Sequence, residues 1–151
     1  GKIAIKVNTS GYGGRSLRKK ITVYTSDPQN RQINLSVSGS IKSFASIRPK
    51  LVRLIGMAGQ PISATVTIIP RKEYPFKIVA TKAQAGEHIR YQLEEEKQSG
   101  SAAYLLTVEN LKKDKGRYYD TIELTTDSRH RQKIQIKVYG QISDPAPKGT
   151  K

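Results

Sequence analysis

Residues 33–41, Ile-Asn-Leu-Ser-Val-Ser-Gly-Ser-Ile, alternate an apolar residue with a polar one, and Gly39 occupies one apolar slot. Residues 134–142, Ile-Gln-Ile-Lys-Val-Tyr-Gly-Gln-Ile, repeat that pattern. Because successive side chains of a strand point to opposite faces, both stretches predict half-buried β-strands. Further strands are expected where Val, Ile, Thr and Tyr gather between turn formers, in residues 3–7, 21–23, 62–68, 76–78, 89–93, 104–108 and 122–124. The sequence therefore predicts an all-β chain.

The two alternating stretches belong to a longer repeat. Residues 21–41 correspond to residues 122–142 at a constant offset of 101. Without a gap, the identical pairs are Ile21/Ile122, Thr25/Thr126, Ile33/Ile134, Val37/Val138, Gly39/Gly140 and Ile41/Ile142. The alternative is that any two β-hairpins look alike. Alternation alone would not also align a Gly and a Thr, so we favour a duplicated unit.

The repeat length predicts the domain plan, because an immunoglobulin-like β-sandwich has about 100 residues. Residues 43–142 are expected to form one complete sandwich of two antiparallel sheets. Residues 1–41 are expected to be the C-terminal three strands of a preceding copy, whose first 60 residues or so would lie upstream. Residues 143–151 lack an apolar anchor and are expected to form a flexible tail.

The repeated unit also carries a family resemblance. Its elements are Gly14-Arg15, then Ile-Thr-Val-Tyr-Thr-Ser-Asp-Pro at 21–28, then the alternating strand at 33–41. This order resembles an uncharacterised bacterial family of immunoglobulin-like modules related to ASH and major-sperm-protein-like domains. The second copy, Thr126-Asp127-Ser128, departs from the pattern because it lacks the Pro. The resemblance implies tandem modules in an extracytoplasmic, often membrane-anchored protein, and it carries over no catalytic or binding residues.

Composition narrows the possible chemistry. The 151 residues carry a formal net charge of +15 and include no Cys. The lack of Cys excludes a disulfide framework, a thiolate zinc site and a Cys nucleophile. No apolar run approaches the roughly 18 residues of a membrane-spanning helix. The chain is thus expected to be a highly charged β-domain with a modest core.

Candidate catalytic and metal-binding residues are few. His88 and His130 are the only imidazoles and lie far apart in the sequence. A zinc site without Cys needs about three His or carboxylate ligands, and no such set is visible. Asp127, Ser128 and His130 share one turn, whereas the members of a catalytic triad converge from different elements. We therefore expect a non-enzymatic protein with no cofactor, no metal and no small-molecule substrate.

The high positive charge suggests one candidate site. Two basic clusters, expected at corresponding turns of the two repeats, form a candidate anion patch of Arg15, Arg18, Lys19, Lys20, Lys112, Lys113, Lys115 and Arg117. Such clusters bind polyanions with an affinity that falls as salt rises. The alternative is that they are solvated faces that protect sheet edges from pairing.

The expected function is a structural or interaction module of a bacterial extracytoplasmic protein. Its partners would be another protein or neighbouring immunoglobulin-like modules of the same chain. The alternative function is binding of a polyanion, namely an acidic glycan, a lipid headgroup or a nucleic acid.

Overall fold

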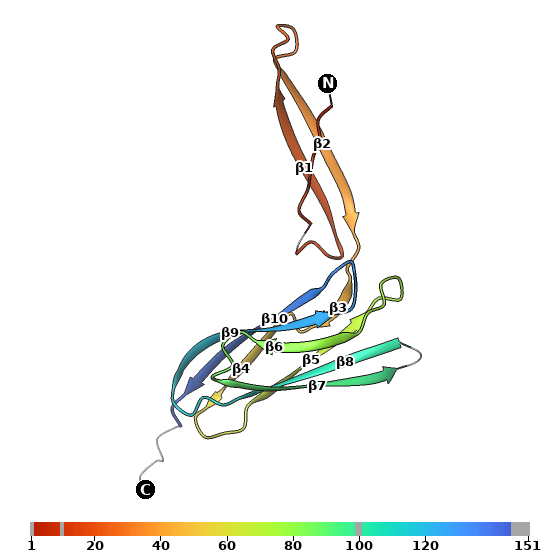
Figure 1. Ribbon diagram of the computed structural model, residues 1–151. Coiled ribbons are helices and arrows are strands. Elements are labelled where there is room, and N and C mark those ends of the chain that lie inside the picture. The colour runs from red at the N-terminus through yellow and green to blue at the C-terminus, as the bar shows by residue number, and fades with distance from the viewer. Residues whose placement is uncertain (1, 10, 99–100, 146–151) are drawn as a thin grey trace. The chain divides into compact units, whose positions relative to one another are not determined.

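The computed structural model describes residues 2–9, 11–98 and 101–145, and regular structure within them is entirely β (Figure 1). The all-β prediction is confirmed. The strands are β1 (Arg15–Tyr24), β2 (Gln32–Ile41), β3 (Ala45–Arg48), β4 (Leu51–Met57), β5 (Ser63–Pro70), β6 (Ile78–Ala83), β7 (Ile89–Gln98), β8 (Ser101–Asn110), β9 (Gly116–Thr126) and β10 (Lys133–Ser143). The chain divides into two compact units, residues 1–44 and residues 45–151. Each is described by itself.

The first unit contains the antiparallel hairpin β1–β2. Its pleat places Leu17, Ile21 and Val23 of β1 and Leu35 and Val37 of β2 on one face. The opposite face carries mainly hydroxyl and amide side chains, such as the bonded pair Thr22 and Asn34. The strand expected at residues 3–7 is not formed, so the described part of this unit has two strands and not three. A strand needs a backbone ladder to a neighbouring strand, and no ladder joins residues 3–7 to a described strand.

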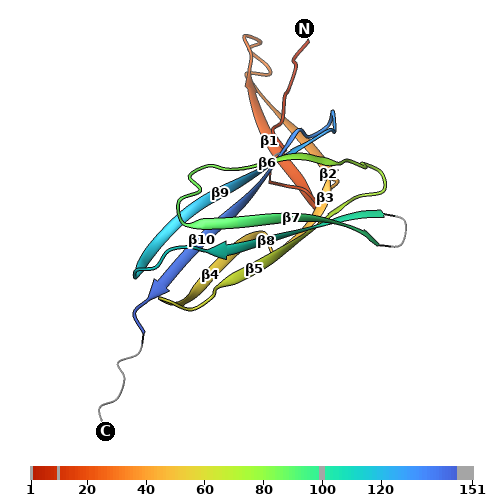
Figure 2. The same ribbon diagram turned by 60° about the horizontal axis from the view of Figure 1, so that its bottom comes forward.

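The second unit consists of two four-stranded sheets, β4–β10–β9–β6 and β3–β5–β8–β7, which pack face to face (Figure 2). Alternate residues of the central strands point inward, as the period-two pattern predicts. The alternating apolar residues of the strands predicted at 122–124 and 134–142 are buried, among them Ile122, Leu124, Ile134, Ile136 and Val138. They meet Val66, Ile68, Leu106 and Val108 of the other sheet, which are equally buried. The unit is therefore a β-sandwich.

One strand pairing departs from the expected antiparallel sheets. Strand β4 runs parallel to β10, with Val52 opposite Val138 and Leu54 opposite Gly140. Parallel neighbours need a long connection between them, and here five other strands supply it. The chain changes sheets at Pro49-Lys50, between β3 and β4, so β4 reaches β10 without a hairpin turn.

Some strand boundaries also differ from the expectation. Strands β3 and β4 lack a clean alternating pattern and were not expected, whereas β6 begins at Ile78, where the expected 76–78 strand ends. Pro49, Pro61 and Pro70 lie between strands or at a strand end, as their missing N–H requires. Ser143 belongs to β10 and not to the expected tail. Residues 146–151 of that tail lie outside the described residues.

The hairpins β1–β2 and β9–β10 have the same register at the 101-residue offset. Ile21 pairs with Leu35 as Ile122 pairs with Ile136. Their connecting turns repeat three hydrogen bonds that involve a side chain. The Thr25 hydroxyl donates to the Asn30 carbonyl at 2.6 Å, and the Thr126 hydroxyl donates to the Arg131 carbonyl at 2.5 Å. The N–H two residues on then donates back to each hydroxyl, at 3.2 and 3.3 Å.

The third shared bond starts at residue 29 or 130. Gln29 N–H donates to Asp27 Oδ1 at 2.9 Å, and His130 N–H donates to Ser128 Oγ at 3.2 Å. Asp and Ser thus perform the same turn-closing role at equivalent positions. The missing Pro of the second turn does not alter this geometry.

Candidate functional site

The outer face of sheet β4–β10–β9–β6 carries an exposed cluster of aromatic, apolar and cationic residues. Three strands of this sheet, β4, β9 and β10, contribute residues to the cluster. On each of them inward residues alternate with outward ones, so Val52, Tyr118 and Val138 are buried while their neighbours along the strand face solvent. We name this cluster the tyrosine patch, and it consists of Arg53, Ile55, Met57, Arg117, Tyr119, Lys137 and Tyr139.

Tyr119 and Tyr139 form the centre of the tyrosine patch. They are directly opposite on β9 and β10, with ring centroids 5.1 Å apart and planes tilted by 37°. The Tyr139 hydroxyl donates to Gln141 Oε1 at 2.7 Å, which holds that ring along its strand. Tyr119 is 77% exposed. The pair therefore offers two oriented ring surfaces to a binding partner.

Cations surround this tyrosine pair. Arg53 lies opposite Tyr139 on β4, Lys137 lies two residues before Tyr139, and Arg117 lies two residues before Tyr119. In the described part of the chain, none of these three cations forms an ion pair. At the outer edge, Ile55 and Met57 of β4 are 55% and 40% exposed. The tyrosine patch thus combines apolar surface with uncompensated positive charge.

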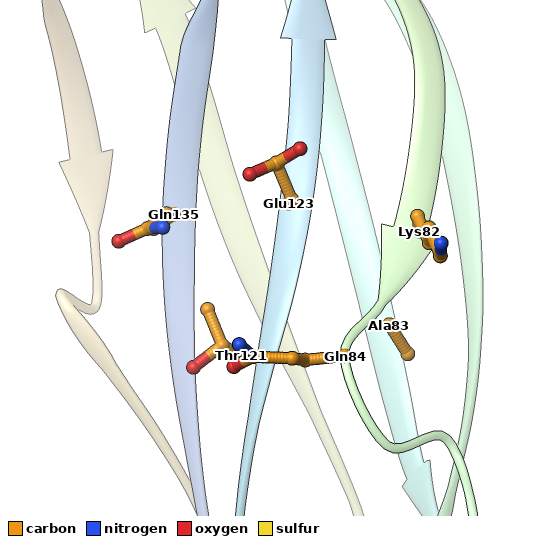
Figure 3. A pocket seen from close by; sticks show the side chains of 6 residues that line it. All are labelled: Lys82, Ala83, Gln84, Thr121, Glu123 and Gln135. Atoms are coloured by element: carbon orange, nitrogen blue, oxygen red, sulfur yellow. The ribbon is translucent and has the colours of Figure 1, made fainter.

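A shallow polar depression of about 200 Å³ continues the same face beyond the tyrosine patch (Figure 3). Its lining residues are Lys82, Ala83, Gln84, Thr121, Glu123 and Gln135. Glu123 Oε1 forms an ion pair with Lys133 Nζ at 2.8 Å, so the negative charge of Glu123 is compensated. The lining contains no imidazole and no activated nucleophile, and its amides, hydroxyl and charges suit polar contacts to a bound surface.

The first basic cluster is placed differently from the expectation. Arg15, Arg18, Lys19 and Lys20 lie along β1 and not at a turn. The pleat of the strand places them on two faces of the hairpin. Arg15 and Lys19 lie on the apolar face with Leu17, and Arg18 and Lys20 lie on the opposite, polar face with Thr22. At the repeat offset, Arg18 and Lys19 match Tyr119 and Asp120 and so do not match the second cluster.

In the second basic cluster, Lys112, Lys113 and Lys115 do lie at the turn before β9, whereas Arg117 lies in β9 itself. Lys113 is exposed, but Lys115 forms an ion pair with Asp144 at 2.7 Å, which raises the pKa of Lys115. The Lys112 N–H donates to Asn110 Oδ1 at 3.3 Å, and Asn110 Nδ2 donates to the Lys112 carbonyl at 2.9 Å. Arg117 alone joins the tyrosine patch. Whether either cluster binds anions stays a prediction.

The remaining candidates have structural partners. His88 packs against Tyr118, and His130 packs edge-on against Tyr74. Asp127 Oδ1 accepts from Lys77 N–H at 2.7 Å, which ties the turn to the segment before β6. Across residues 2–9, 11–98 and 101–145, no group of three His, Asp or Glu side chains could hold a metal ion. The same ranges contain no helix with the length and hydropathy to cross a membrane.

Sequence reasoning missed most of the tyrosine patch. The available signal was Tyr139, an aromatic residue in a polar slot of the alternating 134–142 stretch. The three-strand row of Arg53, Tyr139 and Tyr119 could not be predicted, because it depends on the parallel pairing of β4.

Comparisons with known proteins give little further detail. No protein-family model matches the sequence, and no curated protein matches it. Among solved structures, the chain is similar to PapD-like domain 7 of human CEP192, an ASH/PapD-like domain. Identity is 10%, the TM-score is 0.43, and the match covers 68% of this chain and 87% of that one. The family resemblance stays a prediction.

Proposed function

We propose that this chain is a non-enzymatic interaction module that binds an acidic segment of a partner protein through the tyrosine patch. The observation that carries this proposal is the contact of the exposed Tyr119 ring with the half-buried Tyr139 ring on central strands, flanked by cations that form no ion pair with a described residue. Exposed aromatic and Arg residues are the types that dominate binding energy at protein interfaces. An acidic segment with an aromatic or aliphatic side chain would complement both properties of the patch.

The repeat distinguishes this surface from the general fold. At the 101-residue offset, the positions of Tyr119, Tyr139 and Arg117 are occupied by Arg18, Ser38 and Ser16. These residues lie in a hairpin of the same register. The hairpin geometry therefore does not require tyrosines there, which supports a role in binding.

The wider context belongs to the same proposal. The sandwich would be one immunoglobulin-like module in a tandem array of a bacterial extracytoplasmic protein. The matching register and turn bonds of the two hairpins support the array, and the sequence resemblance supports the setting.

The proposal is tested with fluorescent acidic peptides that differ only in whether they contain an aromatic residue, and with heparin as a polyanion. We expect the aromatic peptide to bind more tightly than the plain acidic one. Tyr119→Ser should weaken binding about tenfold or more, as loss of an interface anchor does. Arg53→Glu should weaken binding of both peptides. Lys72→Glu, in the exposed turn before β6, is the charge-matched control and should have no effect.

Two outcomes would contradict the proposal. If heparin binds and Tyr119→Ser does not weaken it, the chain is a polyanion binder that depends on charge alone. If neither peptide nor heparin responds to Tyr119→Ser or Arg53→Glu, the tyrosine patch is not a binding surface.

A further inference from the structure

Residues 2–9 match strand β8 at the repeat offset, although they are not in a strand. Ile3, Ile5 and Val7 correspond to Tyr104, Leu106 and Val108. Those three counterparts are buried in the sandwich core, whereas Ile3 and Ile5 are 60% and 40% exposed. Both segments have apolar residues at every second position. The first segment therefore has the pattern of a core strand without its neighbours.

The apolar face of hairpin β1–β2 is covered only at Leu17, which is 7% exposed. Its residues Ile21, Val23, Leu35 and Val37 are only half-buried, and Ile33 is exposed. Their counterparts in β9 and β10 are all buried. Exposure of several adjacent apolar side chains to water is unfavourable, so we expect this face to bind another apolar surface.

The second unit shows which elements cover such a face. Strand β4 pairs parallel with β10, β6 pairs antiparallel with β9, and β8 lies between β5 and β7. All of β3 to β7 falls within residues 45–101. At the 101-residue offset, the equivalent segment ends directly before residue 1.

We propose that residues 2–9 and hairpin β1–β2 are the last three strands of a second sandwich, completed by a segment of the same polypeptide equivalent to residues 45–101. This inference rests on the tandem array proposed above. A β4-type strand lies parallel to β2 along Ser36–Ile41, and a β6-type strand lies antiparallel to β1. Residues 2–9 then become a core strand.

The free edge of β2 can be identified from the ladder. Thr25 N–H donates to the Arg31 carbonyl at 3.0 Å, so residues 25 and 31 form a hydrogen-bonded pair. Such pairs alternate along an antiparallel ladder, so Ser38, opposite Arg18, directs its N–H away from β1. Ser38→Pro should block an added strand without removing a β1–β2 bond, because Pro is tolerated on an edge.

The test extends the chain by a copy of its own residues 45–101, joined directly before Gly1. By the β7–β8 register, Leu93 of the added copy would lie opposite Ile5, as Leu93 lies opposite Leu106. The chain has no Cys, so Ile5→Cys together with Leu93→Cys in the added copy reports that pairing alone. We expect this variant to form an intramolecular disulfide. Its yield should be at least tenfold higher than that of an out-of-register control, which combines Ile5→Cys with Lys97→Cys in the added copy.

Hydrogen exchange provides a second readout that does not require a disulfide. In the extended chain, amides of residues 3–7 and 33–41 should gain protection, and Ser38→Pro should remove that gain. An unextended chain that sediments as a dimer dissociated by Ser38→Pro would overturn the proposal, because a second copy would be the occupant. Unchanged exchange together with a disulfide yield no higher than the control would also overturn it. Neither result involves the tyrosine patch, so peptide binding would still test the proposed function separately.

Discussion

At the residue scale, Gly140 has a packing role that its counterpart Gly39 does not share. A Cβ at Gly140 would collide with the ring of Tyr118, which lies directly over it, whereas a Cβ at Gly39 would meet nothing within 4 Å. The Tyr118 hydroxyl donates to Asn110 Oδ1 at 2.7 Å, and burial raises the pKa of Tyr118 to about 12. The glycine therefore makes room for a ring that is fixed at its far end.

We accordingly expect Gly140→Ala to lower the free energy of unfolding of the second unit by about 1–3 kcal/mol, the usual cost of overpacking a core. Gly39→Ala has open space and should leave the unfolding midpoint unchanged. Urea denaturation followed by circular dichroism measures both variants. Equal midpoints for the two would show that Tyr118 moves aside freely.

The sequence predicts one part of this residue-scale picture. Alignment of Gly39 with Gly140 follows from the repeat, but close approach of another group occurs at Gly140 alone. The identity of that group does not follow, because Leu17 and Tyr118 occupy the opposing position in the two hairpins. Similarly, Tyr139 could be recognised as an outward aromatic, but its neighbour Arg53 could not.

At the element scale, Asp120 of β9 holds the connection between β6 and β7. Its Oδ1 accepts from Ala85 N–H at 3.1 Å and from Thr121 N–H at 2.7 Å, and its Oδ2 accepts from Gly86 N–H at 2.8 Å. Burial alone would raise the pKa of Asp120. The backbone N–H groups of Ala85, Gly86, Thr121 and Gln84 outweigh it and hold that pKa below its ordinary value.

A lowered pKa in the folded state means that ionised Asp120 stabilises the fold at neutral pH. This contribution is lost as the pH falls below the ordinary Asp value of about 4 towards the lowered one. Asp120→Asn should therefore cost about 1–2 kcal/mol at pH 7 and make stability less dependent on pH in the acid range. Asp114→Asn, in the exposed turn before β9, is the control. Parallel stability-versus-pH curves for the original chain and Asp120→Asn would contradict this role.

Strand prediction succeeded where the alternating pattern coincides with a half-buried position. Strands β2 and β10 follow directly from that pattern. Strand β4 was missed because Leu51, Ile55 and Met57 face outward although they are apolar, which hides the alternation of Val52 and Leu54. The opposite error occurred at residues 3–7, where the pattern is present but the neighbouring strands are not. Periodicity thus reports a preference for burial, and pairing depends on elements distant in the sequence.

At the scale of the whole molecule, the two hairpins act as an internal comparison for the effect of burial. They share one register and one set of turn hydrogen bonds, so their local ladders are equivalent. They differ in cover, because β9 and β10 form the centre of a sandwich sheet and β1 and β2 form a two-stranded sheet. An isolated two-stranded hairpin is only marginally stable in water.

Hydrogen exchange should therefore separate the two hairpins despite their equal geometry. The comparison uses amides that form hydrogen bonds across each ladder. The β2 group is Ile33, Leu35 and Val37, and the matching β10 group is Ile134, Ile136 and Val138. The β10 amides become exposed only when the sandwich unfolds, whereas the β2 amides become exposed by local opening of the hairpin. We therefore expect hydrogen exchange to be at least about a thousandfold slower for the β10 amides. Mass spectrometry of exchanged peptides measures the ratio in one sample. Similar protection of both groups would mean that the apolar face of β1–β2 is already covered in solution, and the unextended chain would then need no added segment.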